Sequence, residues 1–400
     1  MKILYLADGR SPTAIHWIKY FVDQSHSCHL VSLFPCQPDI KLASLKINPL
    51  RFSGAIGNRQ AEDGVKTKFL KRMAPPKLRT WIRQRFVPGS IPKAVPSLHS
   101  LIQELKPDIV HAMRIPYEGM LTAITITMSR LTDFPFLISV WGNDFTLHAP
   151  ATKYLTRLTK LTLQTADGLH TDCKRDQVYA KAWGFNKEQK IAVVLPGAGG
   201  IQLDRFYPPD KKPGRVIINP RGMRAYIRND TFFKSIPMVL EKYPDAKFIC
   251  PNMADQHEAL GWVEKLGIQA PTELLPLQER DEMANLFRKA RIVVSPSEHD
   301  GTPNTLLEAM ACGCTPIAGD IDTIREWIIP GFNGLVFDPS DPKDLAEMIC
   351  LAMENHELLA RAKRGNRSLI EERAEYSATM REAEKFYQDL IRIKKNQSSR

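Results

Sequence analysis

Two carboxylates, Asp300 and Glu308, stand eight positions apart in the part of the sequence best suited to chemistry. Residues 295–318 have the pattern of a strand, a tight turn, a helix and a second strand, and the helix should begin near Pro303 or Asn304. Glu308 then lies one turn beyond Asn304, where it can accept hydrogen bonds from a ligand diol, and Asp300 can do the same at the loop mouth. The free amides and the dipole of the helix start favour an anion such as a diphosphate.

This window resembles the acidic-x7-Glu signature of glycosyltransferase family 4, the retaining glycosyltransferases of the GT-B fold. The family's first acid is usually Glu, whereas this sequence has Asp300. Further stretches resemble family landmarks: residues 106–112, 166–169, 195–197, 290–297, 308–313, 316–320 and 331–336, with Glu326. The resemblance implies an α/β protein with two Rossmann-like domains facing across a cleft, and a nucleotide-sugar donor that is UDP-linked.

The resemblance also implies which residues bind the donor. Glu308 would contact the nucleotide ribose, and the sugar and diphosphate would lie on the backbone of one loop and helix start, formed by Gly301, Thr302, Pro303, Asn304, Thr305 and Leu306. Gly9 and Gly197 would allow close backbone approach. The family neutralises the diphosphate with a basic pair, expected here to be Arg221 with Arg228 and with Arg224 in reserve. A solvated arginine cluster is the alternative.

The first half departs from the family pattern. The family's His-x-His motif reads His111-Ala112-Met113, so the second imidazole is missing. His111 is either an acceptor-side residue or a buried strand histidine with satisfied hydrogen bonds. Trp141 and Asp144 occupy a turn that faces the cleft in relatives, which makes Asp144 the expected acceptor-side acid and a catalytic candidate beside Asp300 and Glu308. A plain Asx-turn role is the alternative for Asp144.

The elements that must position these residues alternate between short apolar runs and helical patterns, which is typical of parallel α/β sheets. One series of such runs fills the first half of the chain and a second series begins after Pro196. A Gly- and Pro-rich stretch separates the two series, so we expect a domain at 1–200 that binds the acceptor and a domain at 201–375 that binds the nucleotide sugar. A helix at 376–400 should pack back on the first domain, with its end frayed from Lys394.

Charge is distributed unevenly between the two halves. The chain carries 55 Lys and Arg against 44 Asp and Glu, a formal net charge of +11, and residues 66–85 contain eight Lys or Arg and no acid among aromatic and aliphatic residues. Such a stretch, up to Phe86, could lie on an anionic membrane surface, bind an anionic acceptor, or be an ordinary helix and loop with solvated charges. Nucleic acid is disfavoured because no nucleic-acid-binding motif accompanies the charge.

Other features limit the class of protein. The seven cysteines do not have zinc-site spacing and suit a reducing compartment, and no apolar run is long enough to span a bilayer, so we expect a cytoplasmic protein, peripheral on the cytoplasmic membrane face if it touches one. The resemblance implies transfer of a hexosyl-type sugar to a glycan or lipid-linked acceptor in surface polysaccharide or glycolipid assembly, without metal or cofactor. The alternative is a catalytically inactive GT-B binding subunit.

Overall fold

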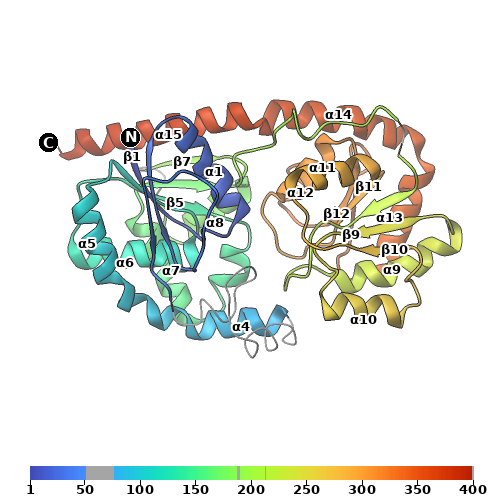
Figure 1. The fold of residues 1–400 in the computed structure, drawn as a ribbon, viewed down its shortest axis with the longest axis horizontal. Helices are drawn as coiled ribbons and strands as arrows, with labels where there is room; N and C mark the ends of the chain where they lie inside the picture. The colour runs from blue at the N-terminus through green and yellow to red at the C-terminus, as the bar shows by residue number, and fades with distance from the viewer. Residues whose placement is uncertain (51–75, 187–189, 212, 399–400) are drawn as a thin grey trace. The chain divides into compact units, whose positions relative to one another are not determined.

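The computed structural model describes residues 1–50, 76–186, 190–211 and 213–398, and these form two compact units. Of the described residues, the first unit contains those of 1–50, 78–199 and 377–398, and the second contains those of 200–376 together with Pro76 and Lys77 at the start of a helix of the first unit. Each unit is a parallel sheet with helices on its faces (Figure 1). The chain therefore leaves the first unit after Gly199 and returns to it with its last helix.

The first unit holds a seven-stranded sheet in the order β3-β2-β1-β4-β5-β6-β7. Its strands are β1 (Lys2–Leu6), β2 (Ser27–Ser32), β3 (Ser44–Ile47), β4 (Ile109–Ala112), β5 (Phe136–Val140), β6 (Gly168–Thr171) and β7 (Ile191–Val194). Its described helices are α1 (Pro12–Asp23), α4 (Pro76–Phe86), η1 (Pro88–Ala94), α5 (Val95–Leu105), η2 (Ile115–Gly119), α6 (Met120–Ser129), η3 (Asp144–His148), α7 (Lys153–Thr165), α8 (Lys174–Ala182) and α15 (Tyr376–Ser398).

The second unit holds a six-stranded sheet in the order β10-β9-β8-β11-β12-β13. Its strands are β8 (Val216–Ile218), β9 (Lys247–Cys250), β10 (Thr272–Leu274), β11 (Ile292–Ser295), β12 (Thr315–Gly319) and β13 (Leu335–Phe337). Its described helices are α9 (Asn229–Lys242), α10 (His257–Lys265), α11 (Arg280–Lys289), α12 (Asn304–Ala311), α13 (Pro342–Glu354) and α14 (His356–Ala374).

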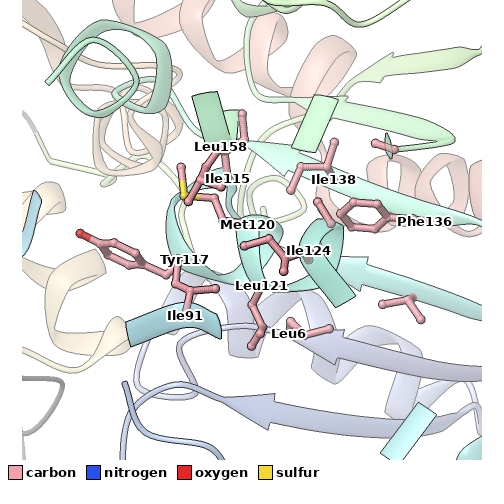
Figure 2. Packing of buried hydrophobic residues seen from close by; sticks show 14 of the residues in the cluster. Leu6, Ile91, Ile115, Tyr117, Met120, Leu121, Ile124, Phe136, Ile138 and Leu158 are labelled. Carbon is pink, nitrogen blue, oxygen red and sulfur yellow. The ribbon is translucent and has the colours of Figure 1, made fainter. Parts of the chain in front are cut away.

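The central strands of both sheets are apolar and fully buried, because helices cover both faces of a parallel sheet. In the first unit, aliphatic side chains of β1, β5 and α6 pack into one core (Figure 2). In the second unit, separate clusters line the two faces of the sheet. Each sheet therefore has a rigid edge where its parallel strands end, which is the usual place for ligand-binding loops in this class of fold.

The last helix, α15, packs on the first unit beside α1 (Figure 1). The hydroxyl of Tyr20 donates to Glu384 Oε2 over 3.1 Å, and Trp17 Nε1 donates to the hydroxyl of Tyr387 over 3.0 Å. Helix α15 extends to Ser398, past Lys394, where the sequence predicts fraying. Lys394 itself forms an ion pair of 2.9 Å with Asp167.

No helix in the described part of the chain is long and apolar enough to cross a membrane. All seven cysteines are free thiols, and five of them are buried.

Candidate functional site

The helix start in the second unit lies where the sequence predicts it. Helix α12 begins at Asn304, directly after the buried residues 301–303, and Asp300 lies in the turn between β11 and this helix. The Asp300 carboxylate accepts a hydrogen bond from Ser297 Oγ at 3.0 Å and from its neighbouring amide, Gly301 N, at 3.2 Å. This network fixes Asp300 at the carboxyl end of β11.

Arg221 joins Asp300 to the helix start. Its guanidinium forms an ion pair with Asp300 through Nη2, and Nη1 donates to Thr305 Oγ1 over 3.2 Å. The side chain is only 5% exposed, yet its Nε has no hydrogen-bond partner among the described residues. Arg221 therefore keeps one buried N–H that could donate a hydrogen bond to an anion bound at the α12 amides. Neutralising such an anion is the role that the sequence predicts for Arg221.

The two arginines of the expected pair have different carboxylate partners. Arg228 grips Asp230 with two hydrogen bonds, of 2.9 Å from Nε and 3.0 Å from Nη2, and lies 3.9 Å from Glu298. Arg224 donates to the Tyr226 hydroxyl over 3.2 Å. The structure thus brings Arg221 to Asp300 and Thr305, but it places Arg228 at the start of α9.

Glu308 projects from α12 one turn beyond Asn304, and its side chain is 13% exposed. Arg280, in the first turn of α11, donates to Glu308 Oε1 through Nη2 over 3.2 Å. Burial raises the pKa of Glu308 to about 7, although Arg280 and Arg205 act in the opposite direction. The carboxyl therefore changes charge near neutral pH, and its state decides whether it can accept hydrogen bonds from a diol.

The remaining residues predicted to bind the nucleotide sugar differ in whether their side chains are available to a ligand. Thr302 Oγ1 accepts a hydrogen bond of 3.1 Å from the indole of Trp327, so this side chain holds the loop. Leu306 is fully buried in the core of the second unit and can offer only its backbone to a ligand. The carboxamide oxygen of Asn304 is buried without a hydrogen-bond partner among the described residues. Asn304 is consequently the side chain in this loop with an unused polar atom.

The acid expected on the acceptor side, Asp144, is committed to hydrogen bonds within the first unit. It is 1% exposed and accepts from Arg114 Nε at 2.9 Å and from two backbone amides, those of Ile115 and Trp141, at 3.3 Å each. Burial raises the pKa of Asp144, and Arg114 opposes that shift. Asp144 is therefore a positioning residue that orients Arg114 and the η2 turn, with the Asx-turn role as part of its function.

His111 is a buried strand histidine. It is fully buried, its Nδ1 is hydrogen-bonded to the Tyr387 hydroxyl and its Nε2 to Ser139 Oγ at 2.7 Å. This series of hydrogen bonds continues from Ser139 Oγ to His170 Nδ1 at 2.7 Å and ends at the carbonyl of Leu195, which is hydrogen-bonded to His170 Nε2. Burial lowers the pKa of both histidines, which keeps them neutral. The acceptor-side interpretation of His111 is replaced by a structural one.

A small pocket nevertheless exists at the carboxyl edge of the first sheet. Its volume is about 110 Å³ and it is lined by Ala7, Asp8, Ser11, Ala14, Phe34, Arg83, Met113, Arg114, Pro116, Tyr117, Glu118 and Trp141. Met113, the position without the second imidazole, is among them, and so is Trp141 from the predicted turn. We call this cavity the first-unit pocket.

The two predicted glycines lie near this edge but differ in purpose. A side chain at Gly9 would collide with Cys36 Sγ, so packing alone requires glycine there. A Cβ on Gly197 would lie 3.7 Å from the Asp172 side chain and 3.8 Å from the indole nitrogen of Trp141, which is ordinary contact. Gly197, predicted on the donor side, and Trp141, predicted on the acceptor side, are therefore neighbours.

Two family models match, one in each half of the chain. Residues 205–369 match the model described as "Glycosyl transferases group 1", and residues 2–172 match "Glycosyl transferase 4-like". Among solved structures, sucrose-phosphate synthase from Thermosynechococcus elongatus has a TM-score of 0.72 at 15% identity and covers 97% of this chain and 98% of its own. HepE from Anabaena, in complex with UDP and glucose, has a TM-score of 0.70 at 13% identity, with 97% and 100% covered. The chain has the GT-B fold of glycosyltransferases.

Curated relatives of this GT-B protein match over part of their length. One is the N,N'-diacetylbacillosaminyl-diphospho-undecaprenol alpha-1,3-N-acetylgalactosaminyltransferase of Campylobacter jejuni, 28% identical over 188 residues, which are 43% of this chain and 47% of that protein. Another is the D-inositol 3-phosphate glycosyltransferase of Mycobacterium sp. strain KMS, 26% identical over 172 residues, which are 40% of this chain and 38% of that protein. The chain thus matches about half, or less, of the length of these relatives.

Sequence reasoning missed Arg280 and Trp327 in the donor half of this GT-B protein. Arg280 reaches Glu308 from 28 positions earlier in the chain. Its position offered one signal, since a cation in the first turn of a helix opposes the helix dipole and needs a compensating partner. Trp327 offered none, because an indole in an apolar stretch is ordinarily a core residue.

One group of side chains in the described part of the chain could hold a metal ion, namely Asp172, Cys173 and Asp176. Arg175 already neutralises Asp176, with hydrogen bonds of 2.9 and 2.8 Å to Oδ1. In the second unit, Asp320 of the Asp-x-Asp sequence is bound by Arg325 over 2.6 and 2.7 Å. Both acidic groups thus have guanidinium partners, as is usual for structural ion pairs.

Proposed function

We propose that this protein is a retaining, metal-independent glycosyltransferase that moves a hexosyl-type sugar from a UDP-linked donor to a glycan or lipid-linked acceptor. The observation that carries the proposal is the arrangement at α12: Asp300 and Arg221 at the helix start, and Glu308 one turn further on. A structural relative with the same fold binds UDP and glucose. Glycosyltransferase models match both halves of the chain.

The geometry suits the electrostatic demand of glycosyl transfer. The reaction develops positive charge on the sugar and negative charge on the departing diphosphate. The buried guanidinium of Arg221 and the free amides at the start of α12 stabilise that negative charge, and no further cation is required by this scheme. When the diphosphate binds, Arg221 turns part of its fork from Asp300 to phosphate oxygens, which frees the Asp300 carboxylate for a sugar hydroxyl.

The retaining course is proposed because the sequence resembles glycosyltransferase family 4, and the proposed scheme needs no protein nucleophile. The leaving phosphate takes the proton of the attacking acceptor hydroxyl on the same face of the sugar, so the C1–O bond to phosphate breaks as the C1–O bond to the acceptor forms. The carboxylates of Asp300 and Glu308 then serve binding, because each has an arginine partner already. Neither needs to form a covalent intermediate in this proposal.

The acceptor and its place in the cell are proposed from two supports. The Campylobacter jejuni relative is named for a diphospho-undecaprenol acceptor, so a lipid-linked saccharide in surface polysaccharide assembly is the acceptor class we propose. Helix α4 exposes Leu78, Trp81 and Phe86 by 47–55% among basic residues, which suits contact with an anionic membrane. The basic residues 66–75 of the predicted membrane stretch lie outside the described residues.

The decisive experiment is transfer from a panel of nucleotide sugars by the purified chain, with donor turnover as readout. Glu308→Ala should reduce turnover by at least a hundredfold, because the ribose loses its carboxylate partner. Glu347→Ala, a change of the same type on an exposed face of α13, is the matched control and should leave turnover unchanged. Near-normal turnover of Glu308→Ala would refute the donor site.

The same experiment addresses the alternative of an inactive GT-B binding subunit. That protein would bind a nucleotide sugar without consuming it. The alternative is not favoured, because the relatives are named as transferases.

A further inference from the structure

The first-unit pocket contains a cation that has no carboxylate partner in the described part of the chain. Arg83, from α4, places its guanidinium 5.8 Å from the centre of the Phe34 ring and 5.7 Å from that of Tyr117. Among the described residues, no carboxylate lies within ion-pair distance of Arg83, whereas Asp8 is gripped by Arg10 and Asp144 by Arg114. Asp8 and Asp144 are thus already paired, and the described neighbours of the Arg83 guanidinium are the ring of Phe34 and the side chain of Tyr117, with which Arg83 also forms a hydrogen bond.

The second acid that lines the pocket, Glu118, does not supply the missing charge. Its side chain is buried, at 3% exposure, and forms no ion pair with a described residue. Burial, with a smaller contribution from Asp8, raises the pKa of Glu118 to about 8. This shift favours the neutral acid, which offers an O–H donor to a ligand, although Arg114 and Arg83 act in the opposite direction.

A further donor and a strained turn belong to the same pocket. The indole N–H of Trp141 is buried without a hydrogen-bond partner among the described residues. Tyr117 has a φ of 75° and a ψ of −58°, a conformation that is strained in a residue other than glycine and that clusters at binding sites. Figure 2 shows its ring extending to one side of the aliphatic core, with the hydroxyl at the far end. The strained backbone thereby keeps an aromatic wall beside Arg83.

The size of the pocket limits what it can hold. A volume of about 110 Å³ is roughly that of three or four water molecules, enough for one compact group. A phosphoryl group is compact, anionic and acceptor-rich, and it matches a guanidinium with neighbouring O–H and N–H donors. A neutral sugar ring would leave the charge of Arg83 without a counter-ion.

We propose that the first-unit pocket binds the phosphoryl group of a phosphorylated saccharide acceptor, with Arg83 as its cation and Glu118 and Trp141 as hydrogen-bond donors. The proposal rests on the proposed function, since it names the acceptor class of that reaction. Arg83 is here a specificity-determining residue, and Asp144 positions the neighbouring Arg114.

The test is calorimetric binding of glucose 1-phosphate to the full chain, with saturating UDP present so that the donor site is filled. Methyl α-glucoside, which lacks the phosphate, should bind at least tenfold more weakly. Arg83→Gln should weaken glucose 1-phosphate binding by about tenfold or more, and Arg83→Lys should restore part of it. Arg85→Gln, on the same helix but outside the pocket lining, is the matched control and should bind as the wild type does.

The outcomes separate the inference from the proposed function. UDP affinity unchanged by Arg83→Gln shows that the variant is folded and that the donor half works. If UDP does not bind the wild type, the proposed function fails. If UDP binds but glucose 1-phosphate binds equally to wild type and Arg83→Gln, the inference is overturned. Binding only to vesicles of phosphatidic acid, with no binding of the soluble phosphate, would also overturn it, because the anion would then be a lipid headgroup outside the pocket.

Discussion

Glu308 and Arg280 form a residue pair in the proposed donor site, and the protonation state of Glu308 should affect donor binding. With its pKa raised to about 7, Glu308 is largely protonated at pH 6 and largely ionised at pH 8. The folded pKa lies above the ordinary value of 4.5, so the unfolded chain releases this proton first as pH rises. Glu308 therefore favours the folded state least above pH 7, and stability is lost progressively as pH rises from about 4.5 to about 7.

Donor binding should move in the opposite direction from stability. An ionised carboxylate accepts hydrogen bonds from a ribose diol better than a protonated one, so affinity for UDP-glucose should rise roughly fivefold to tenfold between pH 6 and pH 8. Glu308→Gln should bind more weakly and show a flat profile, since its amide does not titrate. Calorimetric titration at pH 6, 7 and 8 measures both, and a nucleotide sugar is preferable to UDP because its diphosphate does not titrate in this range.

Some residues of the site could be predicted from the sequence and others could not. Asp300 and Glu308 were predictable because their spacing places them on one turn and one helix face. Arg280, Glu118 and Arg83 were not, because each acquires its role from contacts between distant segments. His111 was ambiguous for the same reason: its partner Tyr387 lies 276 positions away, so only the packing of α15 identifies it as structural.

At the element scale, the buried strands were predictable, whereas the two edge strands of the first sheet were not. Among the apolar runs of the two series, those at 168–171 and 292–295 coincide with β6 and β11, because continuous apolar runs mark buried parallel strands. The run at 335–337 coincides with β13, an edge strand of the second sheet whose first and last residues are buried. The two strands that the pattern missed, β3 and β7, are the edges of the first sheet. Edge strands are half-exposed, as both of these are, and have a weaker apolar signal.

Helix α4 is the element whose exposed face needs a partner. Most of its residues are polar or basic. Its two aromatic side chains, Trp81 and Phe86, are nevertheless 55% and 50% exposed, and their rings pack edge to face. Aromatic side chains among basic ones suit the headgroup region of anionic lipid. The helix is therefore the described part of the predicted membrane stretch that a vesicle experiment can address.

The double variant Trp81→Ser with Phe86→Ser should lower affinity for vesicles containing phosphatidylglycerol by roughly tenfold or more. The reason is that both rings, exposed in the free protein, would lose the transfer free energy gained when they are buried in the membrane. Cosedimentation measures the bound fraction. Met128→Ser removes an apolar side chain that is 70% exposed on α6 and serves as the control. Equal cosedimentation of the double variant and the wild type would show that α4 does not insert.

At the scale of the whole molecule, the last helix ties the end of the chain to the first unit. Tyr387 is fully buried, and its hydroxyl meets both Trp17 Nε1 and His111 Nδ1. The predicted nucleotide site lies in the other unit, which has its own cores. The two units should thus respond to different perturbations, because two-domain chains need not unfold in one step.

Tyr387→Phe removes the hydroxyl and leaves a buried indole N–H and a buried imidazole nitrogen without this partner, at a cost of about 1–3 kcal/mol. In scanning calorimetry it should lower the transition of the first unit, whereas UDP should raise that of the second by mass action. Tyr154→Phe, at a tyrosine of the same unit that is 43% exposed, is the control and should change neither transition. If UDP raises the very transition that Tyr387→Phe lowers, the nucleotide site is not independent of the first unit, and the assignment of donor binding to α12 alone is wrong.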